Sequence, residues 1–131
     1  MSIPTIEEQK TKVLVVDDQD DSADLLASLL PLVYDCTAQA AYSGAGALAL
    51  GDQVLPEVVI LDVTMPGMDG CEAARRMRER PWGRHALIIT LSGWGDDQQC
   101  CAQAGIDFQL RKPVAIDALV EVLAKGRACL S

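Results

Sequence analysis

A chain of 131 residues, half of them hydrophobic, is long enough for one domain with a substantial core and too short for two. Its net charge of −8 argues against direct nucleic-acid binding, which needs Lys and Arg to neutralise phosphates. No apolar run approaches the length of a membrane span, and the polar residues 1–11 lack the apolar core of a signal peptide. We therefore expect a cytoplasmic protein that contacts neither nucleic acid nor membrane.

Five short runs bounded by turn signals predict β-strands; most are apolar, but the run at about 36–41 is alanine-rich and weak as a strand. They cover residues 12–16, about 36–41, 57–62, 86–91 and 106–110. The run at 57–62 is apolar throughout until Asp62, which is typical of a strand buried on both faces.

Helical patterns lie between and after these runs. The first begins near Asp20, has a predicted buried stripe of Leu25, Leu26, Leu29 and Leu30, and is kinked or ended near Pro31. The others are a small helix through 45–50, a helix with Arg75, Arg76 and Arg78 on its solvated face, a helix at 96–104 stopped by Gly105, and a last helix with Ile116, Leu119, Val120 and Leu123 inward. The alternation predicts an α/β fold, with a parallel sheet covered by helices on both faces.

Polar residues follow four of the predicted strands. They are Asp17 and Asp18, Asp62, Ser92, and Lys112. Parallel strands present their carboxyl ends at one edge of a sheet, so these side chains should meet in one pocket. Three carboxylates so close repel and need a cation, and their oxygens suit Mg²⁺, with Mn²⁺ as an alternative.

A divalent cation, a lysine, a hydroxyl and a strand-end carboxylate together indicate phosphoryl transfer to Asp62. The Asp62 carboxylate would be the nucleophile, while Lys112 and Ser92 offset charge on the phosphoryl oxygens. No residue is placed to activate water, so the aspartyl phosphate should be a lasting product. The protein would then be no enzyme beyond its own phosphorylation and slow autodephosphorylation.

These motifs give the chain a resemblance to a known family. Val-Val-Asp17-Asp18, Leu-Asp62-Val-Thr-Met-Pro66-Gly-Met-Asp69-Gly70, Leu-Ser92-Gly and Lys112-Pro113 occur in this order. Over Lys12 to Ala124 the chain resembles the receiver domain of two-component response regulators, especially receivers associated with hybrid sensor histidine kinases. The resemblance implies a flavodoxin-like (βα)5 fold with strand order 2-1-3-4-5, residues 12–126 forming the receiver between a lead-in (1–11) and a tail (127–131).

The resemblance also implies roles for single residues. Asp62 would accept a phosphoryl group from the phosphohistidine of a sensor histidine kinase or phosphotransfer protein. Mg²⁺ would be bound by Asp17, Asp18, Asp62 and the backbone carbonyl of Thr64. Ser92 would swing toward the phosphoryl group, Lys112 would pair with it, and the peptide bond between Lys112 and Pro113 would be cis.

Three positions depart from the family's pattern, and one is Asp35, in a region where glycine commonly ends the first helix. The aromatic residue often found three positions before the lysine is replaced by Gln109, with Phe108 beside it, so the phosphorylation signal should be read differently. Trp94 stands where side chains tune hydrolysis, and its bulk would shield the phosphoryl group and slow dephosphorylation. A downstream protein would bind the usual switching surface, here about 95–125, or the phosphoryl group would be relayed.

Three other functions are open to the same pattern. A receiver-like scaffold would act without phosphorylation. An aspartyl-phosphate-forming hydrolase would need Asp-x-Asp, but Asp62 is followed by Val63 and Thr64. A flavin carrier would need a glycine- and hydroxyl-rich phosphate loop, whereas the acids after the first strand would repel phosphate. The five cysteines contain no C-x-x-C pair and His85 is the only histidine, so reduced thiols without a zinc site or disulfide are predicted.

Overall fold

The computed structural model describes residues 10–63, 70–92, 105–112 and 114–130, the last four without their side chains. The strands are β1 (Thr11–Val16), β2 (Cys36–Ala41), β3 (Val58–Asp62), β4 (Leu87–Ser92) and β5 (Phe108–Arg111). The helices are α2 (Asp20–Val33), α3 (Gly44–Val54), α4 (Gly70–Arg78), the short 3-10 helix η1 (Pro81–Gly83) and α6 (Ile116–Leu130). The predicted helix at 96–104 lies outside the described residues.

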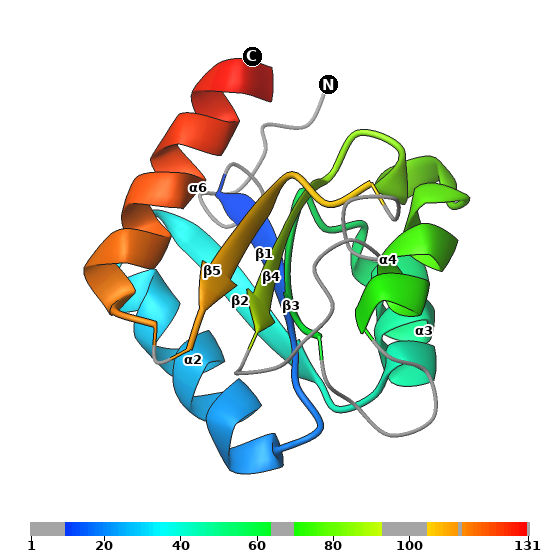
Figure 1. Ribbon diagram of the computed structural model, residues 1–131, viewed down its shortest axis with the longest axis horizontal. Helices are drawn as coiled ribbons and strands as arrows, with labels where there is room; N and C mark the ends of the chain where they lie inside the picture. The colour runs from blue at the N-terminus through cyan, green and yellow to red at the C-terminus, as the bar shows by residue number, and fades with distance from the viewer. Residues whose placement is uncertain (1–9, 64–69, 93–104, 113, 131) are drawn as a thin grey trace, which may run out of the picture.

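The five strands form one parallel sheet in the order β2-β1-β3-β4-β5, which confirms the predicted fold. Helices α2 and α6 cover one face of this sheet, and α3 and α4 cover the other (Figure 1). Successive residues of each strand alternate between the two layers. In β3, for example, Val58 and Ile60 pack in the core that Leu119 and Leu123 of α6 complete, while Val59 and Leu61 pack in the core on the α3 and α4 side. All five residues of β3 are buried, so Asp62 ends a strand covered on both faces.

The buried stripe of α2 differs from the predicted one. Ala23 and Leu30 are fully buried and Leu26 is half-buried, but Leu25 and Leu29 are 60% and 39% exposed. The prediction of one stripe of four leucines was therefore wrong, because small alanines take part of the core-facing side of the helix. Pro31 lies in the last turn, and the helix runs on to Val33.

Helix α3 is longer than predicted and has well-defined ends. The Ser43 hydroxyl accepts a hydrogen bond from the backbone N–H of Gly46 (2.9 Å), which caps the first turn. The helix ends at Val54, and Leu55 directly after it adopts the left-handed conformation (φ 56°) that glycine usually takes there. Leu55 therefore holds a strained backbone just before β3.

Arg78 was predicted to lie on a solvated helix face with Arg75 and Arg76, and this is wrong for Arg78. Its side chain is only 22% exposed and donates hydrogen bonds to segments that precede β4 and β5. The acceptors are the carbonyl oxygens of Gly83, Arg84, Ala86 and Gly105 and the carboxylate of Asp107. Asp107 also accepts the backbone N–H of Ile88 (2.9 Å), so this cluster joins α4 to the amino edge of the sheet.

The cysteines also depart from the prediction of reduced thiols throughout. Cys36 is a buried free thiol on β2, as predicted. Cys71, in the first turn of α4, is disulfide-bonded to a cysteine outside the part of the chain whose side chains are described.

Candidate functional site

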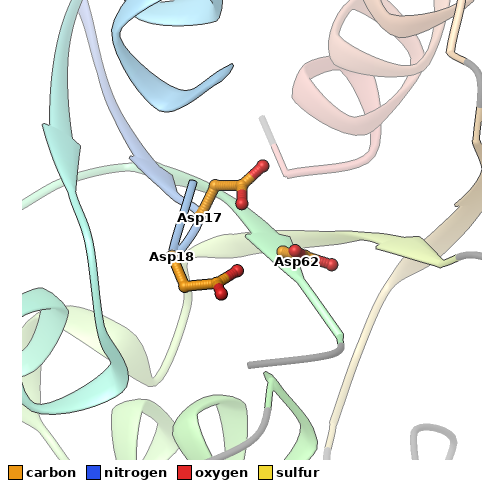
Figure 2. A group of neighbouring side chains, drawn as sticks. All are labelled: Asp17, Asp18 and Asp62. Atoms are coloured by element: carbon orange, nitrogen blue, oxygen red, sulfur yellow. The ribbon is translucent and has the colours of Figure 1, made fainter. Parts of the chain in front are cut away.

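Three carboxylates meet at the carboxyl edge of the sheet. Asp17 and Asp18 directly follow β1, and Asp62 is the last residue of β3. The two strands are hydrogen-bonded neighbours with Val16 opposite Leu61, so both chains reach this edge at the same level. One oxygen of each carboxylate lies within 4.8 Å of the others. Figure 2 shows the three side chains extending into the same space beyond the strand ends.

These carboxylates differ in burial. Asp17 and Asp62 are 8% and 4% exposed, whereas Asp18 is exposed. Asp17 is held in place because its Oδ1 accepts the backbone N–H of Gln19 (3.0 Å) and its own N–H bonds to the carbonyl of Ala41 (3.1 Å). Two nearly buried carboxylates beside a third are costly unless a cation offsets their charge.

Lys112 is the cation that the described residues bring to this cluster. Its Nζ lies 3.2 Å from Oδ1 of Asp62, and its side chain is 40% exposed. The backbone N–H of Lys112 donates to the carbonyl oxygen of Ser92 (2.8 Å), which ties the end of β5 to the end of β4. Ser92 itself is 4% exposed. Asp62, Lys112 and Ser92 thus occupy three adjacent strand ends.

The donor set fits a hard divalent cation. Three carboxylates supply oxygen ligands within a few ångströms, and exposed Asp18 leaves one side open to the water molecules that Mg²⁺ retains. The backbone carbonyl of Thr64, the fourth predicted ligand, lies outside the described residues. So do Trp94, Pro113 and the first part of the predicted 95–125 surface.

Gly70 is a residue whose role the sequence did not reveal. Its backbone N–H donates to the carbonyl of Val63 (2.8 Å), so α4 begins directly against the end of β3. A Cβ atom here would lie 2.4 Å from the carbonyl oxygen of Asp62. Only glycine allows this approach, and the Asp69-Gly70 pair after a Pro/Gly turn was the only signal for it.

The two predicted switch residues lie on opposite faces of β5. Phe108 is half-buried against the core beneath α2 and α6. Gln109 is exposed and sits opposite Thr90 of β4.

Comparisons with known proteins find relatives over most of the chain. The family model of the response regulator receiver domain matches residues 13–124. The response regulator PleD of Caulobacter vibrioides is 39% identical over 106 residues, which are 79% of this chain and 23% of PleD. The virulence sensor protein BvgS of Bordetella bronchiseptica is 39% identical over 136 aligned residues, 97% of this chain and 11% of BvgS. The chain thus spans less than a quarter of either relative.

The solved structure of chemotaxis protein CheY4 of Vibrio cholerae superposes with a TM-score of 0.81 at 26% identity. The match covers 88% of this chain and 98% of CheY4. Among the helices that the structure describes, none has the length and apolar character to cross a membrane.

Proposed function

Because the chain belongs to the response regulator receiver domain family, whose general function is phosphoryl acceptance in two-component systems, we propose that Asp62 accepts a phosphoryl group from a phosphohistidine in a Mg²⁺-dependent reaction. The observation that carries the proposal is the convergence of Asp17, Asp18 and Lys112 on Asp62. An Asp62 oxygen attacks phosphorus as the P–N bond of the donor breaks, and the donor imidazole takes the electron pair.

Each neighbouring side chain then has a distinct task. The Lys112 ammonium, already 3.2 Å from Asp62, stays close enough to offset charge on the transferred phosphoryl group. The Ser92 hydroxyl, at the adjacent strand end, donates a hydrogen bond to the same group. Asp17, Asp18, Asp62 and the Thr64 carbonyl would hold Mg²⁺, which would supply positive charge to offset the carboxylates as the phosphoryl group approaches.

Relatives support the choice of phosphoryl donor. BvgS is a sensor protein, and the sensor histidine kinase RcsC of Salmonella typhi is 35% identical over 86% of this chain. The donor of this chain is therefore a sensor histidine kinase or a phosphotransfer protein. The proposal has three further parts. A downstream protein binds the surface at about 95–125 and is switched by phosphorylation. The peptide bond before Pro113 is cis, and Trp94 shields the phosphoryl group. Replacement Trp94→Ala should shorten the phosphoryl lifetime measured by radiolabel decay.

The direct test is the intact mass after incubation with acetyl phosphate, with and without Mg²⁺. We expect one phosphoryl adduct on the wild type that needs Mg²⁺, and none on Asp62→Asn. The matched control is Asp117→Asn, which removes an exposed carboxylate from the first turn of α6 and should leave the adduct intact.

Absence of an adduct on the wild type, with Mg²⁺ binding demonstrated, would favour the alternative of a receiver-like scaffold that acts without phosphorylation. An adduct that persists in Asp62→Asn would move the acceptor to another residue. Rapid release of phosphate would support the hydrolase instead.

A further inference from the structure

Cys71 forms a disulfide bond that the site described above does not use. It lies in the first turn of α4, is 5% exposed, and packs in the core between the sheet and the helices α3 and α4. Its neighbour Gly70 donates its backbone N–H to the carbonyl oxygen of Val63, the residue after Asp62. The disulfide therefore fixes a turn that rests directly on the strand end that carries Asp62.

The partner of Cys71 follows by elimination. Cys36 is a free thiol in the core beneath α2 and α6. Cys129 lies in the last turn of α6, on the face of the sheet opposite α4 (Figure 1). The Cα atoms of a disulfide are at most about 7 Å apart, whereas helices on opposite faces are separated by the sheet and two layers of side chains. The remaining cysteines are Cys100 and Cys101, so one of these two, which lie outside the described residues, is the partner.

The bond joins two parts of the chain that have different tasks in the proposed function. Cys71 belongs to the turn beside the phosphoryl acceptor, and both candidate partners belong to the surface at about 95–125 that is proposed to bind a downstream protein. An intact bond keeps its two ends together, so it restricts motion of that surface relative to α4. The bond coexists with the ion pair between Lys112 and Asp62 (3.2 Å), and it therefore belongs to the state in which the lysine pairs with the carboxylate itself.

We propose that Cys71 is one half of a redox switch, whose disulfide form resists phosphorylation of Asp62 and whose dithiol form permits it. The inference rests on the proposed function, because phosphorylation is what the switch controls. A bond that fits one of two states favours that state, so the disulfide lowers the affinity of any ligand that needs the other state. By reciprocity, the phosphorylated protein should be easier to reduce, by the same factor.

The oxidation step balances with a small-molecule disulfide, such as glutathione disulfide, as the oxidant. The thiolate of the partner cysteine attacks one sulfur of that molecule and releases a first thiol, which leaves a mixed disulfide on the protein. Cys71 then loses its proton, attacks the protein sulfur of the mixed disulfide and releases a second thiol. Two protein thiols are thus oxidised, and one small disulfide is reduced to two thiols, which take up the two protons. Cys71 takes the second step because its burial keeps an external molecule away from it.

The test compares the oxidised and the reduced wild type, prepared with glutathione disulfide and with dithiothreitol. Peptide mapping of the oxidised protein by mass spectrometry should find Cys71 linked to Cys100 or Cys101. Beryllofluoride with Mg²⁺, a mimic of the bound phosphoryl group, should bind the reduced protein about five- to tenfold more tightly, the size of a typical coupling between two sites. The adduct from acetyl phosphate should also form faster on the reduced protein.

Matched variants separate the bond from the residue. Cys71→Ser should behave like the reduced wild type under both oxidising and reducing conditions. Cys36→Ser, which replaces the free thiol of the other core, should keep the difference between the two conditions. Cys71→Ala repeats the first test without placing a hydroxyl in the core. The reduced wild type carries no substitution, so a folding defect in a variant cannot produce the expected result.

The inference is overturned if peptide mapping after oxidation finds Cys71 as a free thiol, or bonded to Cys36 or Cys129. It is also overturned if the oxidised and reduced wild type bind beryllofluoride equally and gain the acetyl phosphate adduct at the same rate. That result would leave the proposed function intact. If neither form binds beryllofluoride or gives an adduct, the proposed function fails, and this inference fails with it.

Discussion

At the carboxyl edge of the sheet three carboxylates and one lysine face each other, whereas at the amino edge the Arg78 guanidinium is surrounded by acceptors. The carboxylates of the carboxyl edge each have one oxygen within 4.8 Å of the others. The amino edge has one cation whose acceptors include the carboxylate of Asp107 at 2.9 Å. Satisfied hydrogen bonds stabilise a fold, while gathered like charges destabilise it until a ligand arrives. The comparison suggests that one edge of the sheet maintains the structure and the other is kept reactive.

The largest effect is expected from Arg78→Met. It removes the donor from the part-buried carbonyl oxygens of Gly83 and Ala86 and leaves the half-exposed Asp107 without its cation, so the free energy of unfolding should fall by about 2–4 kcal/mol. Arg78→Lys should recover little of this, because an ammonium cannot reproduce the planar array of donors. Urea denaturation of both variants gives the values. The matched control is Arg75→Met on the exposed side of α4, and a similar loss there would refute the structural role assigned to Arg78.

A smaller loss is expected from Gly70→Ala. The new Cβ must displace either the end of β3 or the start of α4, which should cost about 2 kcal/mol. It should also slow phosphorylation by acetyl phosphate, because the displaced backbone belongs to Asp62. Gly46→Ala is the control, since its Cβ would meet only the Ser43 side-chain oxygen that caps α3, and no strand backbone. Unchanged stability and rate in Gly70→Ala would show that the contact can relax.

Asp18→Asn, unlike the two variants above, should stabilise the metal-free protein. Without Mg²⁺ it relieves repulsion among the three carboxylates, and because Asp18 is exposed the gain should be at most about 1 kcal/mol. With Mg²⁺ the wild type should have the higher melting temperature, because Mg²⁺ binding to the folded state stabilises the wild type more than Asp18→Asn. Thermal unfolding with EDTA and with millimolar Mg²⁺ makes the comparison. A Mg²⁺ response equal to that of the wild type would remove Asp18 from the site.

The smallest effect is expected at Leu55, on the amino edge. Its left-handed backbone is strained for a branched side chain, so Leu55→Gly should raise the free energy of unfolding by about 0.5 kcal/mol, because the greater unfolded-chain entropy of glycine offsets part of the relief. The phosphorylation rate should not change. A change in that rate would show that strain at the amino edge also serves the reactive edge.

The sheet and the residues of its carboxyl edge were predictable, because buried strands and strand-end acids are local features of the sequence. The strand order came from the family resemblance. The rotation of α2 was not predictable. Its sequence offers two apolar stripes, and the choice depends on what the sheet presents opposite the helix. Leu32 and Val33, 78% and 50% exposed, belong to the stripe that stays outside with Leu25 and Leu29.

The role of Arg78 could not be predicted either. Its acceptors lie 5 to 29 positions further along the chain, and most are carbonyl groups that every residue carries. An arginine among other arginines on a helix looks solvated until the fold brings those carbonyl groups to it.

The outward stripe of α2 has a consequence for how the protein behaves in concentrated solution. Helix α2 exposes an apolar stripe to solvent, made of Leu25, Leu29, Leu32 and Val33. Molecules with a net charge of −8 repel each other, and this repulsion opposes association through the exposed apolar stripes. As the pH falls toward the isoelectric point near 4.4, or as salt screens the charge, the repulsion fades. Colloidal stability of this domain is therefore a property of its acids as much as of its core.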